Sequence, residues 1–118
     1  MRLVAGAEPA LDRIPVRMEG EIRLLPVADI VYCYADGDRT VLVTSGGELR
    51  SHLSLARLAE RLEPFRFFRC HRAYLVNLAY VCSVIPWTRN AYSLALNGGK
   101  EITLSKHRVA ALKELVPW

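Results

Sequence analysis

Residues 65–77 read Phe-Arg-Phe-Phe-Arg-Cys-His-Arg-Ala-Tyr-Leu-Val-Asn, a stretch in which aromatic, basic and aliphatic residues interleave. We expect its apolar side chains to point inward: Phe65, Phe68, Cys70, Tyr74 and Val76. Its polar side chains would then face water or a partner: Arg66, Arg69, His71, Arg72 and Asn77. Guanidinium and imidazole groups held on an aromatic-anchored backbone suit contacts with phosphates and base edges. The structural alternative is that Arg69 pairs with a nearby Glu and that His71 fills a polar notch.

Alternating apolar and polar residues predict short strands on both sides of this stretch. Upstream, the predicted strands cover residues 14–18, 21–25, 30–35, 39–44 and 48–52, with a helical turn at 26–29. Downstream, they cover residues 81–87, 91–96 and 101–104. The pair Asp36-Gly37 is typical of a tight hairpin. The chain therefore reads as a mainly β domain.

Two segments have helical rather than strand periodicity. Ser54 is a good N-cap for a first helix, which Pro64 ends. Its inner face is predicted to hold Leu55, Leu58, Ala59 and Leu62. Ser105 is expected to cap a second helix over residues 107–116, with Val109, Leu112 and Leu115 on its inner face.

The length of the chain and its apolar runs limit the possible architectures. A chain of 118 residues fits one domain with its own core, and we expect a flexible lead-in over residues 1–12 before a domain at 13–118. No apolar run approaches the roughly 18 residues that would span a bilayer, so a cytoplasmic location is the default.

Positive charge is concentrated in the second half of the chain. Residues 1–63 hold eight Lys or Arg against ten Asp or Glu, a net charge of −2. Residues 64–118 hold eight against two, a net charge of +6. Such a basic half favours a polyanionic partner such as nucleic acid, although a solvated basic face would look the same.

Residues 67–77 resemble the signature of the LytTR family of bacterial transcriptional regulators, F-x-R-x-H-R-S-Y-x-V-N, with Ala73 in place of the usual Ser. The flanks are similar in order. Residues 30–34 resemble the family's I-x-Y-I-E strand without its acidic residue, and Leu104-Ser-Lys also matches. The resemblance covers about residues 14–116. It implies an elongated arrangement of small antiparallel sheets with two short helices, placed behind a receiver or sensory domain that is not in this chain.

The resemblance also implies a function, namely sequence-specific binding of double-stranded promoter DNA through loops that enter successive grooves. Paired protomers on direct repeats are the expected complex. By position, three loops supply the contacts: the hairpin 36–40, the loop 70–73 and the start of the last helix. The expected DNA-binding residues are Arg39, Arg69, His71, Arg72, Asn77, Lys106, His107 and Arg108.

Physical chemistry supports these positions. Arginine can bond guanine O6 and N7 together, and a helix start can hold a phosphate. Asp36 and Asp38 flank Arg39, however, and would repel phosphates unless Arg39 alone projects.

Other classes of function were weighed against DNA binding. Three cysteines without C-x-x-C spacing argue against a disulfide framework and a structural zinc site, and we expect no cofactor or metal. The histidines and remaining thiols lack ligand spacing: His52, Cys70, His71, Cys82 and His107. Adjacent residues of a strand point to opposite faces, so Cys70 and His71 are not expected to act as an enzyme's nucleophile and base.

Two alternatives stay open. One is a β-rich protein-interaction module anchored by Trp87 and Trp118. The other is a redox-sensing regulator in which Cys70 pairs with a second cysteine and blocks DNA binding.

Overall fold

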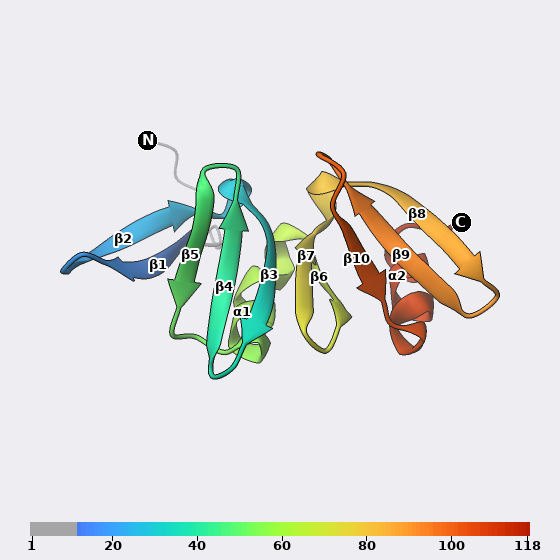
Figure 1. Ribbon diagram of the computed structural model, residues 1–118, viewed down its shortest axis with the longest axis horizontal. Coiled ribbons are helices and arrows are strands. Elements are labelled where there is room, and N and C mark those ends of the chain that lie inside the picture. Colours follow the sequence, from blue (N-terminus) through green and yellow to red (C-terminus); the bar gives the residue numbers. More distant parts are fainter. Residues whose placement is uncertain (1–11) are drawn as a thin grey trace, which may run out of the picture.

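The computed structural model describes residues 12–118, in which ten strands form three antiparallel sheets placed side by side (Figure 1). The first sheet pairs β1 (Arg13–Met18) with β2 (Glu21–Pro26). The central sheet has the order β5-β4-β3-β7-β6, and the third has the order β10-β9-β8. Their bounds are β3 (Ile30–Asp36), β4 (Arg39–Thr44), β5 (Gly47–Ser51), β6 (Phe67–His71), β7 (Tyr74–Asn77), β8 (Val81–Thr88), β9 (Ala91–Leu96) and β10 (Glu101–Leu104).

The predicted mainly β class is confirmed. Each of the eight strands predicted outside the central stretch ends within one residue of its expected bounds. The expected lead-in over residues 1–12 lies, apart from Asp12, outside the described residues. No helix within residues 12–118 is long and apolar enough to cross a membrane.

The first predicted helix is confirmed as α1 (Leu55–Leu62), and Ser54 caps it by accepting a hydrogen bond at Oγ from the Arg57 amide at 3.1 Å. The chain does not leave the helix directly at Pro64. It continues as a 3-10 turn, η2 (Glu63–Phe65), because proline is tolerated in a first turn. Two further 3-10 turns, η1 (Val27–Asp29) and η3 (Leu78–Tyr80), lead into β3 and β8.

The second predicted helix differs from expectation at both ends. A 3-10 turn, η4 (Lys106–Arg108), precedes α2 (Val109–Leu115), and Ser105 makes no side-chain capping bond. Leu115 was expected inside but is 52% exposed, because it is the last residue of a helix whose buried anchor is Leu112. The tight first turn delays the α-helix by two residues, so the predicted inner face holds only in part.

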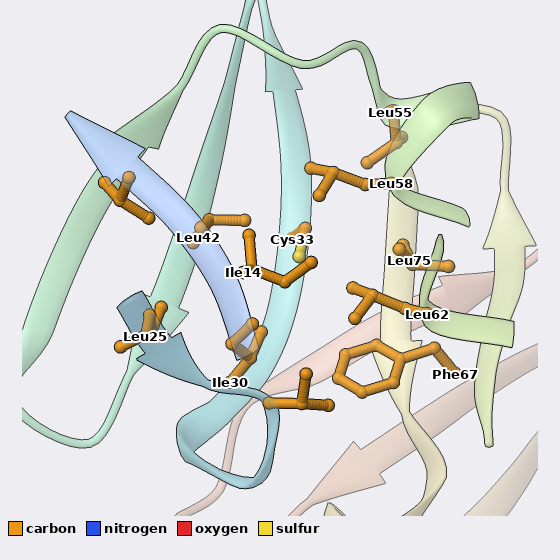
Figure 2. Close-up of a cluster of buried hydrophobic side chains, with 12 residues drawn as sticks. Ile14, Leu25, Ile30, Cys33, Leu42, Leu55, Leu58, Leu62, Phe67 and Leu75 are labelled. Atoms are coloured by element: carbon orange, nitrogen blue, oxygen red, sulfur yellow. The ribbon is translucent and has the colours of Figure 1, made fainter. Parts of the chain in front are cut away.

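Successive residues of the central strands enter two different hydrophobic cores. Tyr32, Phe68 and Val76 pack in a core shared with the third sheet and α2. Their neighbours Cys33, Phe67 and Leu75 pack in a core with α1 and the first sheet. Figure 2 shows side chains of α1, of β1 and of the central sheet gathered in this latter core. The continuous apolar runs of the sequence therefore reflect strands that are covered on both faces.

Phe67 was not among the expected inward residues, although it is only 6% exposed. The prediction placed only Phe68 of this pair inward, because it assumed that one face of the strand alone is buried. Phe68, Cys70 and Val76 are buried as predicted, whereas Phe65 and Tyr74 are half-buried.

Candidate nucleic-acid interface

Three turns lie along one edge of the molecule, the lower edge in Figure 1. They join β3 to β4, β6 to β7, and β10 to η4. We call residues 36–39, 71–74 and 105–108 the loop edge. Backbone hydrogen bonds hold its parts together: the Ala35 amide donates to the Ala73 carbonyl at 3.1 Å, and the Ser105 amide to the Cys70 carbonyl at 2.8 Å. The fold thus assembles the three segments that the sequence indicated separately.

The first segment is a hairpin with a two-residue turn, Gly37-Asp38, and Arg39 is the first residue of β4 after that turn. Gly37 has φ 65°, the left-handed conformation that a tight hairpin requires and that glycine adopts without strain. Arg39 is exposed and opposite Asp36 in the strand register. The Asp36 carboxylate accepts a hydrogen bond from Arg50 Nη1 at 2.9 Å, and this contact raises the pKa of Arg50. Arg50 therefore offsets the negative charge beside Arg39.

The second segment presents Arg72 and His71. Arg72 is exposed at the turn between β6 and β7. His71 is half-buried, and its ring meets the Tyr74 ring edge-on at 5.9 Å. Its Nδ1 accepts a hydrogen bond from the Ala73 amide at 3.0 Å, so a neutral ring carries its proton on Nε2. His71 thus has an internal role that leaves one N–H donor.

The third segment exposes two of its three basic residues. Lys106 and His107 are exposed in η4, whereas Arg108 is half-buried. Arg108 Nε donates to the Arg69 carbonyl at 2.8 Å, and its guanidinium lies 4.8 Å from the centre of the Phe68 ring. Arg108 is therefore fixed against β6 by these two contacts.

Arg69 does not pair with a Glu, the structural alternative considered for it. Within residues 12–118 the ion pairs are Arg23 with Glu21 and Arg50 with Asp36. The Arg69 side chain instead donates to the carbonyl oxygens of His71, at 3.2 Å, and of Arg72. It braces the turn that carries Arg72.

Asn77 was expected to face water or DNA, and that expectation is wrong. The residue is 4% exposed. Its Nδ2 donates to the Ile30 carbonyl at 2.9 Å, and its Oδ1 accepts from the Ala79 amide at 3.0 Å. The side chain ties β7 to the start of β3 and caps η3, a structural role that the motif alone does not reveal.

The structure adds basic residues beside Arg39 that the sequence analysis did not select. Arg50 and His52 line a hollow of about 490 Å³ together with Arg39. Arg50 lies in β5, where the antiparallel register places it opposite Val41, and His52 follows directly after the strand. The observed register follows from a two-residue turn at 45–46, one residue shorter than the turn expected at 45–47.

The two buried thiols, Cys33 and Cys70, lack the character of nucleophiles or redox sensors. Burial raises the pKa of Cys70 to about 12, although Arg108 and Arg69 act in the opposite direction. Burial likewise raises the pKa of Cys33 to about 12. Reactive cysteines have low pKa values and are accessible, so these features disfavour the redox alternative for Cys70. Among the described residues, no three His, Cys, Asp or Glu side chains gather as metal ligands would.

Comparison with known families shows to which family the chain belongs. The profile of the LytTr DNA-binding domain matches residues 20–116, which include all three segments of the loop edge. The chain belongs to the LytTR family. This family is one of DNA-binding domains and not a class of enzymes.

A solved LytTr DNA-binding domain, from a response regulator of Bacillus cereus, has the same fold. It superposes with a TM-score of 0.81 over 92% of this chain and 99% of that one, at 18% identity. The elongated arrangement of small sheets that the resemblance implied is thereby confirmed.

Curated relatives of this LytTR domain are regulators. The sensory transduction protein LytT of Oceanobacillus iheyensis is 30% identical over 106 residues, 88% of this chain and 43% of that protein. The heme-containing CO-sensing transcriptional regulator RcoM 1 of Paraburkholderia xenovorans is 33% identical over 116 residues, 94% of this chain and 43% of that protein. The transcriptional regulatory protein YpdB of Escherichia coli K12 is 29% identical over 106 residues, 89% of this chain and 43% of that protein. The chain thus spans less than half the length of these relatives.

Proposed function

We propose that this LytTR domain binds promoter DNA sequence-specifically by inserting the loop edge into successive grooves of the duplex. One observation carries the proposal: three turns with exposed basic residues share one edge, tied by backbone hydrogen bonds. The described residues extend 47 × 38 × 24 Å, and in Figure 1 the turns follow one another along the longest axis. Because the turns lie in a row, separate segments can enter grooves on the same face of the duplex.

The side chains of the loop edge divide into two roles in this proposal. The residues best suited to read guanine edges are Arg72, in the turn between β6 and β7, and Arg39, directly after the turn between β3 and β4. A guanidinium can bond guanine O6 and N7 together. Lys106 and His107 suit contacts with phosphates, which fix register without reading sequence. Asn77 has no direct part, since its amide is used inside the fold.

The domain acts, in this proposal, as the output module of a longer cytoplasmic regulator. Its relatives are about twice as long, which leaves room for a receiver or sensory domain that supplies the input. Binding by paired protomers to direct repeats remains part of the proposal. A protein-interaction role for the tryptophans has less support, because Trp87 donates to Ser93 Oγ at 2.7 Å and Trp118 packs on Tyr92 at 6.2 Å between ring centres.

Selection of bound fragments from the genomic DNA of the host tests this function. The protein is incubated with sheared DNA, and the retained fragments are sequenced and titrated at several salt concentrations. We expect enrichment of a short motif, with log K falling by about 0.9 per phosphate contacted for each log unit of salt. Retention without any enriched motif, or an affinity that is flat from low to physiological salt, would contradict the proposal.

A further inference from the structure

Strand β6 contains one residue more than its partner β7 over the same length. Phe68 lies opposite Val76, and His71 lies opposite Tyr74, so three steps along β6 match two along β7. This mismatch is a β-bulge at residues 69–70, immediately before the turn that carries Arg72. Bulges of this kind redirect backbone and side-chain groups next to functional sites.

The bulge turns two successive carbonyls toward the third segment of the loop edge. In a regular strand, neighbouring carbonyls point to opposite edges. Here the Arg69 carbonyl accepts from Arg108 Nε at 2.8 Å, and the Cys70 carbonyl accepts from the Ser105 amide at 2.8 Å. β6 is the outer strand of the central sheet, so its free edge is available for this contact. The third segment is thus attached to the second at two adjacent points.

The side chain of Arg69 completes the connection from the other side. It reaches past its own strand to the carbonyls of His71 and Arg72, one from Nε and one from Nη2. Two carbonyls bonded by one guanidinium suit the rigid fork of arginine, which lysine cannot reproduce. Arg108 is fixed differently, by one carbonyl and the face of Phe68.

We propose that Arg69 and Arg108 are positioning residues, which together with the bulge set the spacing between the second and third segments of the loop edge. They do not contact DNA; they hold Arg72 and Lys106 at the separation that the duplex requires. This inference replaces the direct DNA contact expected for both arginines from the sequence. It rests on the proposed function for its consequence, but not for its structural part.

The structural part can be tested without DNA, by amide hydrogen exchange on wild type, Arg69→Lys and Arg108→Lys. Both variants keep the charge but lose the contacts of the guanidinium group. We expect exchange at the Ser105 amide to accelerate about tenfold or more in Arg108→Lys, and loop amides at 72–73 to accelerate in Arg69→Lys. Amides in the core formed with α1 and the first sheet, such as the amide of Leu42, serve as the internal standard of folding. Unchanged protection at Ser105 and at residues 72–73 would overturn the positioning role of the two arginines.

The functional part uses the fragment enriched by the genomic selection and a scrambled fragment of equal length. If the arginines position the loops, both Lys variants should lose about tenfold in affinity for the enriched fragment and bind the scrambled one almost unchanged. Wild-type affinity in the Lys variants would overturn the proposal, because a retained positive charge would then suffice.

Salt titration of the Gln variants separates positioning from contact. We expect Arg69→Gln and Arg108→Gln to keep the wild-type salt slope, whereas Lys106→Gln makes it shallower by about 0.9. Arg23→Gln, in the first sheet, is the control for loss of one remote charge. A slope reduced by about 0.9 in either Arg variant would make that residue a phosphate contact. If the wild-type protein selects no fragment, the proposed function fails. The exchange result still decides whether Arg69 and Arg108 position the two segments.

Discussion

The role of Arg72 can be tested directly, because its side chain is exposed at a turn whose backbone is held by Arg69. We predict that Arg72→Ala costs about 1–3 kcal/mol in discrimination between the selected site and a site mutated at one base pair. Competition binding with the two fragments measures this difference. Arg23→Ala, the matched control, should leave discrimination unchanged. An equal loss on all DNA would show instead that Arg72 contacts a phosphate.

Asn77 should behave as a structural residue. Asn77→Ala leaves the buried Ile30 carbonyl without its side-chain donor and removes the acceptor for the Ala79 amide. We predict a loss of about 1–3 kcal/mol in the free energy of unfolding, measured by urea denaturation. Affinity per folded molecule, at a temperature where the variant is folded, should stay within about twofold of wild type. Normal stability with lost DNA binding would refute this assignment.

The three thiols should differ sharply in reactivity. Cys82 is exposed, whereas burial raises the pKa of both Cys33 and Cys70 to about 12. At pH 8 we predict one iodoacetamide adduct, on Cys82, and three only after denaturation, as read by mass spectrometry. The folded pKa lies above the value of about 8.5 for an unfolded thiol, so the unfolded chain ionises first and stability falls as the pH rises above about 9. Rapid native modification of Cys70 would reopen the redox alternative.

At the scale of residues, the sequence pointed to the important residues but was less successful in predicting their roles. Polar residues of the central stretch were all placed at the surface, because alternation and a motif give only a direction and a family position. Arg69 and Asn77 instead bond backbone carbonyls that come from the turn of the same hairpin or from residue 30. Such partners depend on how strands register in space, which no local pattern contains.

At the scale of elements, two serines provide a matched comparison. Ser54 accepts a capping bond from Arg57, whereas Ser105 makes no side-chain capping bond before η4. We predict that Ser54→Ala lowers the free energy of unfolding by about 1 kcal/mol and that Ser105→Ala changes it by less than about 0.5. Thermal and urea unfolding of the two variants measure the difference. Equal destabilisation would mean that Ser105 caps the helix in solution.

Strands were predictable and their irregularities were not. The alternation in β4 or β9 locates each element within one residue, because side-chain direction is a local property. The bulge in β6 follows from the opposing register of β7 and from contacts with residues 105–108. Nothing in the order of residues 67–71 announces it, although it shapes the loop edge.

At the scale of the whole molecule, the central sheet has a core on each face, and this explains both the apolar runs and the elongated shape. The sequence predicted the class and, through the family resemblance, the arrangement. It did not assign residues to the two cores, because period-two alternation says which residues share a face but not what covers that face. Charge patterning pointed to the basic half, yet the turn between β3 and β4, from the acidic half, joins the same edge (Figure 1).

The central claim is that DNA meets the loop edge, and amide hydrogen exchange with and without the genomically selected fragment tests it most directly. We expect slower exchange on adding DNA at residues 36–39, 71–74 and 105–108 together, and no change in β1 and β2. A scrambled fragment at the same salt concentration should give weaker protection of the same residues. Protection confined to the first sheet or to the helices, or absent from one of the three segments, would contradict binding through the loop edge.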